Sequence, residues 1–193
     1  MQLPKGMTVL DFGCGSGRVG RYFPKVTGAD VIGVDLHRDA IEWCQAHMPH
    51  GTFMVGTVAP PLNLPDNSVD ALLAVSVLTH LDGDLEEAWL AEWKRVLKPG
   101  GIAVVTYHGE GLVALKLPKG SQMELEVSRQ WQERGGIAFI DNKAWAGIFP
   151  DAYQTTYHRN DHIRSVWGRH FDILELLPSG GFINQHDVAV LRA

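Results

Sequence analysis

An aspartate followed by three glycines at alternate positions stands near the start of the chain. Asp11 ends a short apolar run, and Gly13, Gly15 and Gly17 follow it. Glycine has no Cβ, so such a turn can adopt positive φ angles and let a ligand approach the backbone. A helix is expected to begin near Arg18, and the free N–H groups of its first turn favour a negative group at the turn. The pattern predicts a binding loop for a nucleotide-like cofactor.

The same loop is compatible with a dinucleotide. Gly15, Gly17 and Gly20 fit the pattern G-x-G-x-x-G, and Asp35 follows close to the distance expected for an acid that binds a ribose. A nucleotide-dependent oxidoreductase is therefore one function that the loop allows. Asp11 favours another cofactor, because a carboxylate beside the loop would repel a pyrophosphate but suits a cationic ligand.

The motif Asp-x-Gly-x-Gly-x-Gly resembles that of the class I S-adenosylmethionine-dependent methyltransferases, in which it holds the methionine end of the cofactor. Residues 64–73, Leu-Pro-Asp-Asn-Ser-Val-Asp-Ala-Leu-Leu, and residues 95–101, Arg-Val-Leu-Lys-Pro-Gly-Gly, resemble phrases of the same family. The resemblance is continuous over residues 8–107, with its parts in the family's order and spacing. It implies a small-molecule methyltransferase that uses S-adenosylmethionine, whose ammonium and sulfonium are cationic.

Short apolar runs alternate with amphipathic segments, as in a parallel sheet whose strands are joined by helices. Strands are expected from about residue 7, and at 31–35, 53–55, 68–76, 102–107, 137–140, 171–176 and 187–191. Helices are expected at 18–25, 39–48, 84–97, 121–134 and 160–168, with Trp89 and Trp93 spaced for burial in the core.

The resemblance implies an α/β fold: a Rossmann-like, doubly wound, seven-stranded sheet, mostly parallel with an antiparallel C-terminal hairpin strand, and with helices on both faces. Residues 1–193 would form a single methyltransferase domain, in which residues 109–170 are an insertion on the substrate side between strands five and six.

The predicted cofactor site combines the glycine loop with the ends of three further strands. Asp35 ends the second strand and can accept hydrogen bonds from both hydroxyls of a ribose, with Leu36 beside the adenine. Many relatives have an acid where Thr57 stands, so here the Thr57 hydroxyl or the Val58 N–H is expected to meet the adenine. Ser76 ends the fourth strand and is expected near the sulfonium. The full set is Asp11, Gly13, Cys14, Gly15, Gly17, Arg18, Asp35, Leu36, Thr57, Val58, Ser76 and Val77.

Methyl transfer is an in-line displacement in which the protein mainly positions donor and acceptor. A base is needed only where the acceptor must lose a proton. His108 is the first candidate because it ends strand five, and His158 and His80 are further candidates by location. A lone histidine is more often structural than catalytic. The sequence has no histidine–acid pattern that indicates a metal site.

Composition limits the classes of partner. The 193 residues carry a formal net charge of −5, which gives no electrostatic reason to expect nucleic acid or an anionic membrane. No apolar run approaches bilayer length, and the two cysteines are expected to be reduced thiols in a cytoplasmic protein. A small-molecule substrate is therefore expected, with the oligomeric state left open.

The acceptor is expected to be an oxygen or nitrogen, with a hydroxyl preferred over an amine. Residues 75–81, Val-Ser-Val-Leu-Thr-His-Leu, differ from the Asn/Asp-Pro-Pro-Tyr/Phe motif of enzymes that methylate nucleobases and glutamine. Resemblance alone associates the chain with glycan and secondary-metabolite pathways. Two alternatives remain: an oxidoreductase, disfavoured because Tyr157 rather than lysine follows Tyr153 at the dyad spacing, and a module that binds S-adenosylmethionine without catalysis.

Overall fold

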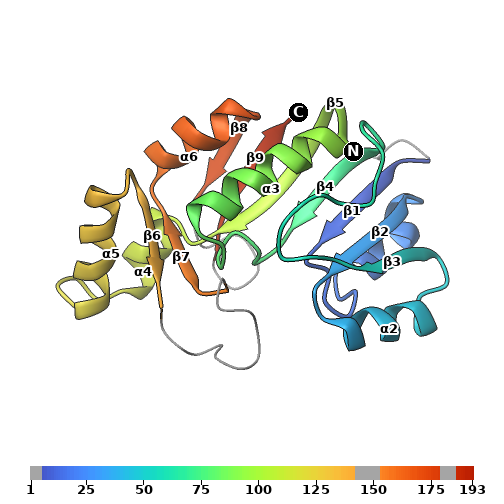
Figure 1. Cartoon of the computed structure of the whole chain (residues 1–193), viewed down its shortest axis with the longest axis horizontal. Helices are drawn as coiled ribbons and strands as arrows, with labels where there is room; N and C mark the ends of the chain where they lie inside the picture. The colour runs from blue at the N-terminus through green and yellow to red at the C-terminus, as the bar shows by residue number, and fades with distance from the viewer. Residues whose placement is uncertain (1–5, 142–152, 179–185) are drawn as a thin grey trace.

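A computed structural model describes residues 6–141, 153–178 and 186–193, and shows a sheet of seven strands with helices on both faces (Figure 1). The strand order is β3-β2-β1-β4-β5-β9-β8. The strands are β1 (Thr8–Phe12), β2 (Asp30–Asp35), β3 (Gly51–Val55), β4 (Val69–Ala74), β5 (Leu97–Tyr107), β8 (Asp172–Leu177) and β9 (Asp187–Arg192). The described helices are η1 (Gly20–Tyr22), α1 (Phe23–Thr27), α2 (Arg38–His47), α3 (Gly83–Val96), α4 (Glu110–Lys116), α5 (Gln122–Glu133), α6 (Asn160–Val166) and η2 (Trp167–Arg169).

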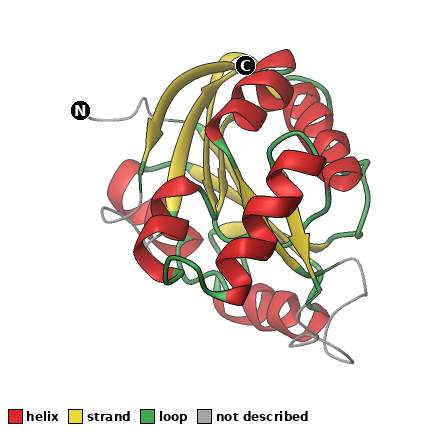
Figure 2. Ribbon diagram, turned by 90° about the vertical axis from the view of Figure 1, so that its left-hand side faces the viewer, coloured by secondary structure: helices red, strands yellow, loops and turns green. Residues whose placement is uncertain are grey.

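The sheet is parallel from β3 to β5 and closes with antiparallel pairing. Strands β1 to β5 pair in parallel, whereas β9 runs antiparallel to both β5 and β8. The strands twist through the molecule between helical layers (Figure 2). The predicted Rossmann-like fold with an antiparallel C-terminal strand is therefore confirmed. The predicted turn before β9 lies largely outside the described residues.

The main core lies between the sheet and α3. Leu10 and Phe12 of β1 point to one face, where the ring of Phe12 lies 4.6 Å from that of Trp89 and 5.2 Å from that of Trp93. Both tryptophans are almost completely buried, as their helical spacing predicts. The other face is covered by α2, whose Cys44 packs in a smaller cluster with Phe53 of β3.

The helix predicted at residues 18–25 begins later. The chain turns through Arg18, forms the short 3-10 helix η1, and enters α1 only at Phe23. Pro24 therefore stands in the first turn of α1, where its missing N–H would have no partner inside the helix. The delay leaves a longer irregular segment after the glycines than the sequence predicts.

A small lobe of α4, α5, β6 (Ile137–Ile140) and β7 (Thr155–His158) lies at the opposite end of the molecule from α2 (Figure 1). Strands β6 and β7 pair antiparallel in a second sheet. Neither α4 nor β7 was predicted. Residues 142–152 of the predicted insertion lie outside the described residues. Among the helices that are described, none is long and apolar enough to cross a membrane.

Candidate functional site

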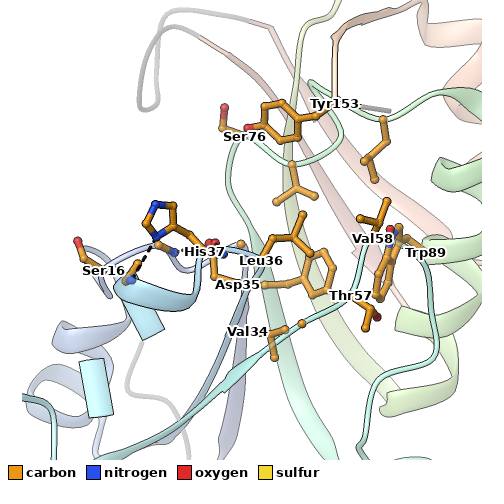
Figure 3. A pocket seen from close by; sticks show the side chains of 17 residues that line it. Ser16, Val34, Asp35, Leu36, His37, Thr57, Val58, Ser76, Trp89 and Tyr153 are labelled. Atoms are coloured by element: carbon orange, nitrogen blue, oxygen red, sulfur yellow. Dashed lines mark hydrogen bonds between the residues drawn. The ribbon is translucent and has the colours of Figure 1, made fainter. Parts of the chain in front are cut away.

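A cavity of about 360 Å³ opens at the carboxyl ends of β1, β2 and β4. Strand order reverses between β1 and β4, and in open α/β sheets such a switch point is where ligands bind. Asp35 and Leu36 at the end of β2, Ser76 after β4, and Tyr153 all face it (Figure 3). The cavity is thus formed by residues far apart in the sequence.

The glycine turn forms one wall of the cavity and needs glycine for two reasons. Gly13 has φ +75°, and a Cβ there would stand 2.5 Å from Cγ2 of Val77. Gly15 has φ +52°, in the left-handed region. The amides of Gly13 and Cys14 donate to the carbonyl of Val34 at 2.8 and 3.1 Å, which ties the turn to β2. The predicted binding loop is therefore a fixed wall with room for a ligand against its backbone.

Asp35 holds the turn and faces the cavity. One carboxylate oxygen accepts a hydrogen bond from the amide of Gly15 at 2.7 Å, and the other accepts one from the amide of His37 at 2.8 Å. Each oxygen of an ionised carboxylate can accept more than one hydrogen bond. The Asp35 carboxylate is therefore oriented by the backbone and still able to accept both hydroxyls of a ribose.

Asp11 lies behind the glycine turn. Its carboxylate is 3 % exposed, is not part of the cavity wall, and accepts a hydrogen bond from the amide of Gly20 at 3.0 Å. Burial raises the pKa of Asp11 to about 6, despite the bond from Gly20. The structure therefore gives Asp11 a role in shaping the turn. The sequence predicts that its carboxylate repels a pyrophosphate, but the buried carboxylate does not face the cavity in which a ligand would lie.

Three other predicted site residues are also outside the cavity wall. Cys14 is buried, and its thiol donates to the carbonyl of Gly15 at 3.5 Å. Gly17 is buried, and a Cβ there would stand 2.5 Å from Sδ of Met48. Arg18 is exposed on the turn. These residues support the loop, while the predicted residues that line the cavity are Gly13, Gly15, Asp35, Leu36, Thr57, Val58, Ser76 and Val77.

The far end of the cavity is an apolar slot with a polar rim. Phe12 and Trp89 line it, although the sequence predicts Trp89 as core alone. Trp89 Nε1 donates to the carbonyl of Val58 at 3.0 Å, which holds the loop after β3 in place. The Thr57 hydroxyl donates to the carbonyl of Ala59 at 2.6 Å, so its oxygen remains an acceptor for an amino group. A flat heterocycle with an exocyclic amine fits this slot.

Ser76 occupies the other end of the cavity in a rare backbone conformation. Its φ is +60°, which costs free energy for a residue other than glycine. The Ser76 amide donates to Thr106 Oγ1 at 2.8 Å, and its hydroxyl lies 3.2 Å from that of Thr79. Backbone strain of this kind clusters at functional sites. Ser76 and its neighbour Val77 line the cavity, and their predicted role near the sulfonium stays a prediction.

Two of the predicted histidines lie together beside this end, held by β7. His80 Nδ1 is 2.7 Å from the carbonyl of Gln154, and His108 Nδ1 is 3.1 Å from that of Thr156. Tyr153 lines the cavity and stacks on His80 with ring centroids 4.0 Å apart. Neither histidine is part of the cavity wall itself: His80 lies behind the ring of Tyr153, and the ring centroid of His108 is 6.5 Å from that of His80.

His158 lies elsewhere, in a buried network. It is fully buried and contacts Glu86, which is also bound by His162 Nε2 at 2.7 Å. Burial alone would raise the pKa of Glu86, but the two histidines lower it to about 2. The network joins α3 to β7 and α6, so the structure gives His158 a supporting role and does not bring it to the cavity.

Sequence reasoning missed two residues of this region. Tyr153 follows residues outside the described part of the chain, and burial together with Asp35 raises its pKa to about 12, so the phenol stays neutral. His186 precedes β9 and packs against His108 with ring centroids 4.9 Å apart. The irregular aromatic composition around Tyr153 was a signal for it, whereas no local pattern marks His186.

A family model described as "Methyltransferase domain" matches residues 10–105. The chain belongs to the S-adenosylmethionine-dependent methyltransferases. A sterol 24-C-methyltransferase of Aspergillus fumigatus is 36% identical over 107 residues, which are 53% of this chain and 28% of that protein. A ubiquinone biosynthesis O-methyltransferase of Mesorhizobium japonicum is 30% identical over 139 residues, 70% of this chain and 53% of that one. The chain thus spans about half or less of the length of these curated relatives.

Solved structures of methyltransferases share the fold. An S-adenosylmethionine-dependent methyltransferase of Methanosarcina mazei superposes with a TM-score of 0.73 at 19% identity, over 98% of this chain and 93% of that one. A 1,6-didemethyltoxoflavin-N1-methyltransferase of Burkholderia thailandensis, solved with its substrate and S-adenosylhomocysteine, has a TM-score of 0.67 at 18% identity, over 97% and 71%. The methyltransferase fold therefore extends beyond the matched residues 10–105 to the small lobe and the closing strands.

The residues that line the cavity fit the cofactor of the family. The Asp35 carboxylate would accept hydrogen bonds from a ribose, the Thr57 hydroxyl oxygen would accept one from an amine, and Phe12 and Trp89 give the cavity an apolar part. Gly13 leaves open the space that a Cβ would fill. Within the described ranges, no group of three or more potential metal ligands comes together.

Proposed function

We propose that this methyltransferase domain transfers a methyl group from S-adenosylmethionine to a hydroxyl of a small molecule. The observation that carries the proposal is the Asp35 carboxylate, held by Gly15 and His37 on the wall of a cavity at the switch point of the sheet. A glycan or a secondary metabolite is the class of acceptor that we favour. By their names, the relatives include enzymes that methylate carbon, oxygen and nitrogen.

The residues would divide the work between binding and positioning. Asp35 would hold the ribose, Thr57 or the Val58 amide would hold the adenine, and the glycine turn would support the methionine part. When bound, S-adenosylmethionine supplies the methyl group, and the electron pair of the broken carbon–sulfur bond stays on sulfur. Ser76 and Val77 would border the place where donor and acceptor meet.

A hydroxyl acceptor must lose a proton, and we propose that His108, which follows the end of β5, receives it. Burial, with His186 and His80 beside it, lowers the pKa of His108 to about 3, so the resting ring is neutral and is a weak base until an acceptor and its developing charge are beside it. His108 is half-buried rather than sealed, so the proton can pass on to solvent. His80 is the second candidate. His158 is fully buried against Glu86, and we favour a structural role for it.

The test is formation of S-adenosylhomocysteine from S-adenosylmethionine with matched panels of alcohols, phenols, amines and carboxylic acids. We expect turnover with hydroxyl compounds, and a loss of it in His108→Phe, which keeps the ring packing but has no lone pair to accept the proton. Methylation confined to amines or acids would refute the hydroxyl acceptor. Cofactor binding without turnover on any panel would instead favour a module that binds S-adenosylmethionine without catalysis.

A further inference from the structure

A second cavity lies between α1 and the carboxyl end of α2, apart from the cavity at the switch point of the sheet. Its volume is about 420 Å³, within the range of about 300–1,000 Å³ that is usual for ligand sites. It opens over the amino ends of β2 and β3, where Val31 pairs with Gly51. Among the described residues, none lines both cavities. We call this second space the α2 cavity.

One part of the α2 cavity is apolar. Val31 and Phe53 line it and are almost fully buried, and the partly buried Met48 packs against the cluster that contains Phe53. Pro24 and Pro49 add further apolar surface from α1 and from the residue after the end of α2. An apolar group that enters this part of the cavity would leave water, which is favourable.

Basic side chains line the other part of the α2 cavity. Arg21 and Lys25 come from η1 and α1, whereas His47 and His50 lie at the end of α2 and after it. None of the described lining residues is acidic. Within the described ranges, neither Arg21 nor Lys25 forms an ion pair. The cavity therefore concentrates positive charge on a chain whose formal net charge is −5.

The guanidinium of Arg21 is held in place by the glycine turn. Its Nε donates to the carbonyl of Gly17 at 3.0 Å, and its Nη2 donates to that of Ser16 at 3.4 Å. Its central carbon lies 5.9 Å from the centre of the Trp43 ring, which also lines the α2 cavity. A guanidinium has five N–H groups, and no other group in the described part of the chain accepts from the remaining three. Such a planar donor matches the two oxygens of a carboxylate.

We propose that the α2 cavity is a second ligand site, which binds a small carboxylate with an apolar body. The carboxylate pairs with Arg21 and Lys25, and the apolar body lies against Val31, Met48 and Phe53. An ammonium compound is disfavoured because it meets charges of its own sign, and an uncharged compound gains no ion pair. A bare inorganic anion gains nothing from the apolar part. The site is separate from methyl transfer and goes beyond the proposed function.

The first test is calorimetric titration of the chain with 2-naphthoate, 2-naphthamide and 2-naphthylmethylammonium, which share a ring system and differ in charge. S-adenosylhomocysteine is present in excess to occupy the cavity at the switch point. We expect one 2-naphthoate to bind per chain, at least tenfold more tightly than 2-naphthamide, with no binding of the ammonium compound. Similar affinities for the three compounds, no binding of 2-naphthoate, or its displacement by an equal concentration of inorganic phosphate would overturn the proposal.

The place of binding is read from NMR on the chain with ¹³C-labelled methionine methyl groups. We expect 2-naphthoate to shift the signal of Met48, which lines the α2 cavity, and to leave those of Met54 and Met123 unchanged. Binding without a shift of the Met48 signal would overturn the site. Failure of the chain to bind S-adenosylhomocysteine would count against the proposed function instead, because the Met48 signal reports the α2 cavity whether or not the other cavity is filled.

The second test removes the positive charges one at a time. We expect 2-naphthoate to bind about tenfold more weakly to Arg21→Gln, the effect of a charge-assisted hydrogen bond, and about threefold more weakly to Lys25→Gln, whose ammonium is exposed. Arg21 also holds the glycine turn, whereas Lys25 donates to no carbonyl of that turn, so Lys25→Gln keeps the test independent of the turn. Lys116→Gln is the matched control, since Lys116 is an exposed lysine on α4. Unchanged 2-naphthoate binding in Arg21→Gln and Lys25→Gln would overturn the proposal.

Discussion

The carboxylate of Asp35, at the end of β2, accepts a hydrogen bond from the amide of Gly15 across 20 residues of sequence, at 2.7 Å. This bond joins the second strand to the glycine turn after the first. It explains why an acid at this position serves two purposes: it sets the turn and it presents its remaining lone pairs to the cavity. Loss of the acid should therefore affect the ligand and the loop together.

Asp35→Ala is expected to weaken binding of S-adenosylhomocysteine by about tenfold to a hundredfold. The reason is the loss of charge-assisted hydrogen bonds, each worth about 1.5–3 kcal/mol. Isothermal titration calorimetry measures the change. Asp39→Asn is the control, because Asp39 is an exposed acid in the first turn of α2. Equal affinities in Asp35→Ala and the unaltered chain would show that Asp35 does not bind the ribose.

Gly13→Ala should abolish cofactor binding, because the new Cβ would stand 2.5 Å from Cγ2 of Val77 on the cavity wall. Gly28→Ala separates this clash from backbone strain, since Gly28 has a similar φ of +70° and nothing within 4 Å of its added Cβ. We expect Gly28→Ala to lower stability by about 1 kcal/mol and to bind the cofactor normally. Thermal unfolding with and without S-adenosylhomocysteine checks both, and a normal ligand-induced rise in Tm for Gly13→Ala would contradict the account.

Asp11→Asn should increase stability at alkaline pH. Burial raises the pKa of Asp11 to about 6 in the folded chain, above its ordinary value of 3.8. The folded state therefore holds the proton more tightly, and this contribution to stability is present at low pH and is lost as pH rises through about 6. The shift corresponds to about 3 kcal/mol. Asparagine can still accept from the Gly20 amide and has no charge to bury.

The measurement is urea unfolding of both proteins at pH 5 and pH 8. At each pH, the free energy of unfolding of the unaltered chain is subtracted from that of Asp11→Asn. The subtraction removes the contribution of the buried histidines, whose lowered pKa values make stability rise with pH. We expect this difference in the free energy of unfolding to be larger at pH 8 than at pH 5, in favour of Asp11→Asn. A difference that does not change with pH would show that Asp11 is not buried as described.

Glu86→Gln should destabilise the fold by about 3–5 kcal/mol, the cost of breaking a buried pair. Glu86 is fully buried between His158 and His162, whereas its neighbour Glu87 is half-exposed and pairs with Arg169 on the surface. Glu87→Gln is therefore the matched control, with an expected change of about 0.5 kcal/mol or less. Similar unfolding free energies for the two variants would contradict the structural role given to this network and to His158.

The strands that form the sheet could be predicted because each is a local apolar run, and the Asp35 end of the site followed from the spacing of the glycine turn. The elements that were missed depend on distant partners. Helix α4 begins where its amides donate to Asp187, 76 residues from Gly111. Strand β7 is defined by pairing with β6 and by its contact with His108. No pattern within one segment contains such information.

The histidines show the same limit. His108 could be placed near the site because it ends β5, and His80 because it follows β4. His158 appeared equivalent in the sequence, but its burial against Glu86 depends on how α3 packs on β7. His186 packs against His108 because β9 pairs antiparallel with β5, which brings Asp187 opposite Tyr107. Tertiary pairing, and not local sequence, decides which histidines meet.

Binding of S-adenosylmethionine in the cavity can be measured by calorimetric titration of the purified chain with S-adenosylmethionine, S-adenosylhomocysteine and NAD. We expect micromolar binding of one molecule of either sulfur compound and no binding of NAD. Binding of NAD without either sulfur compound would contradict this expectation and would make Gly15, Gly17 and Gly20 a dinucleotide loop.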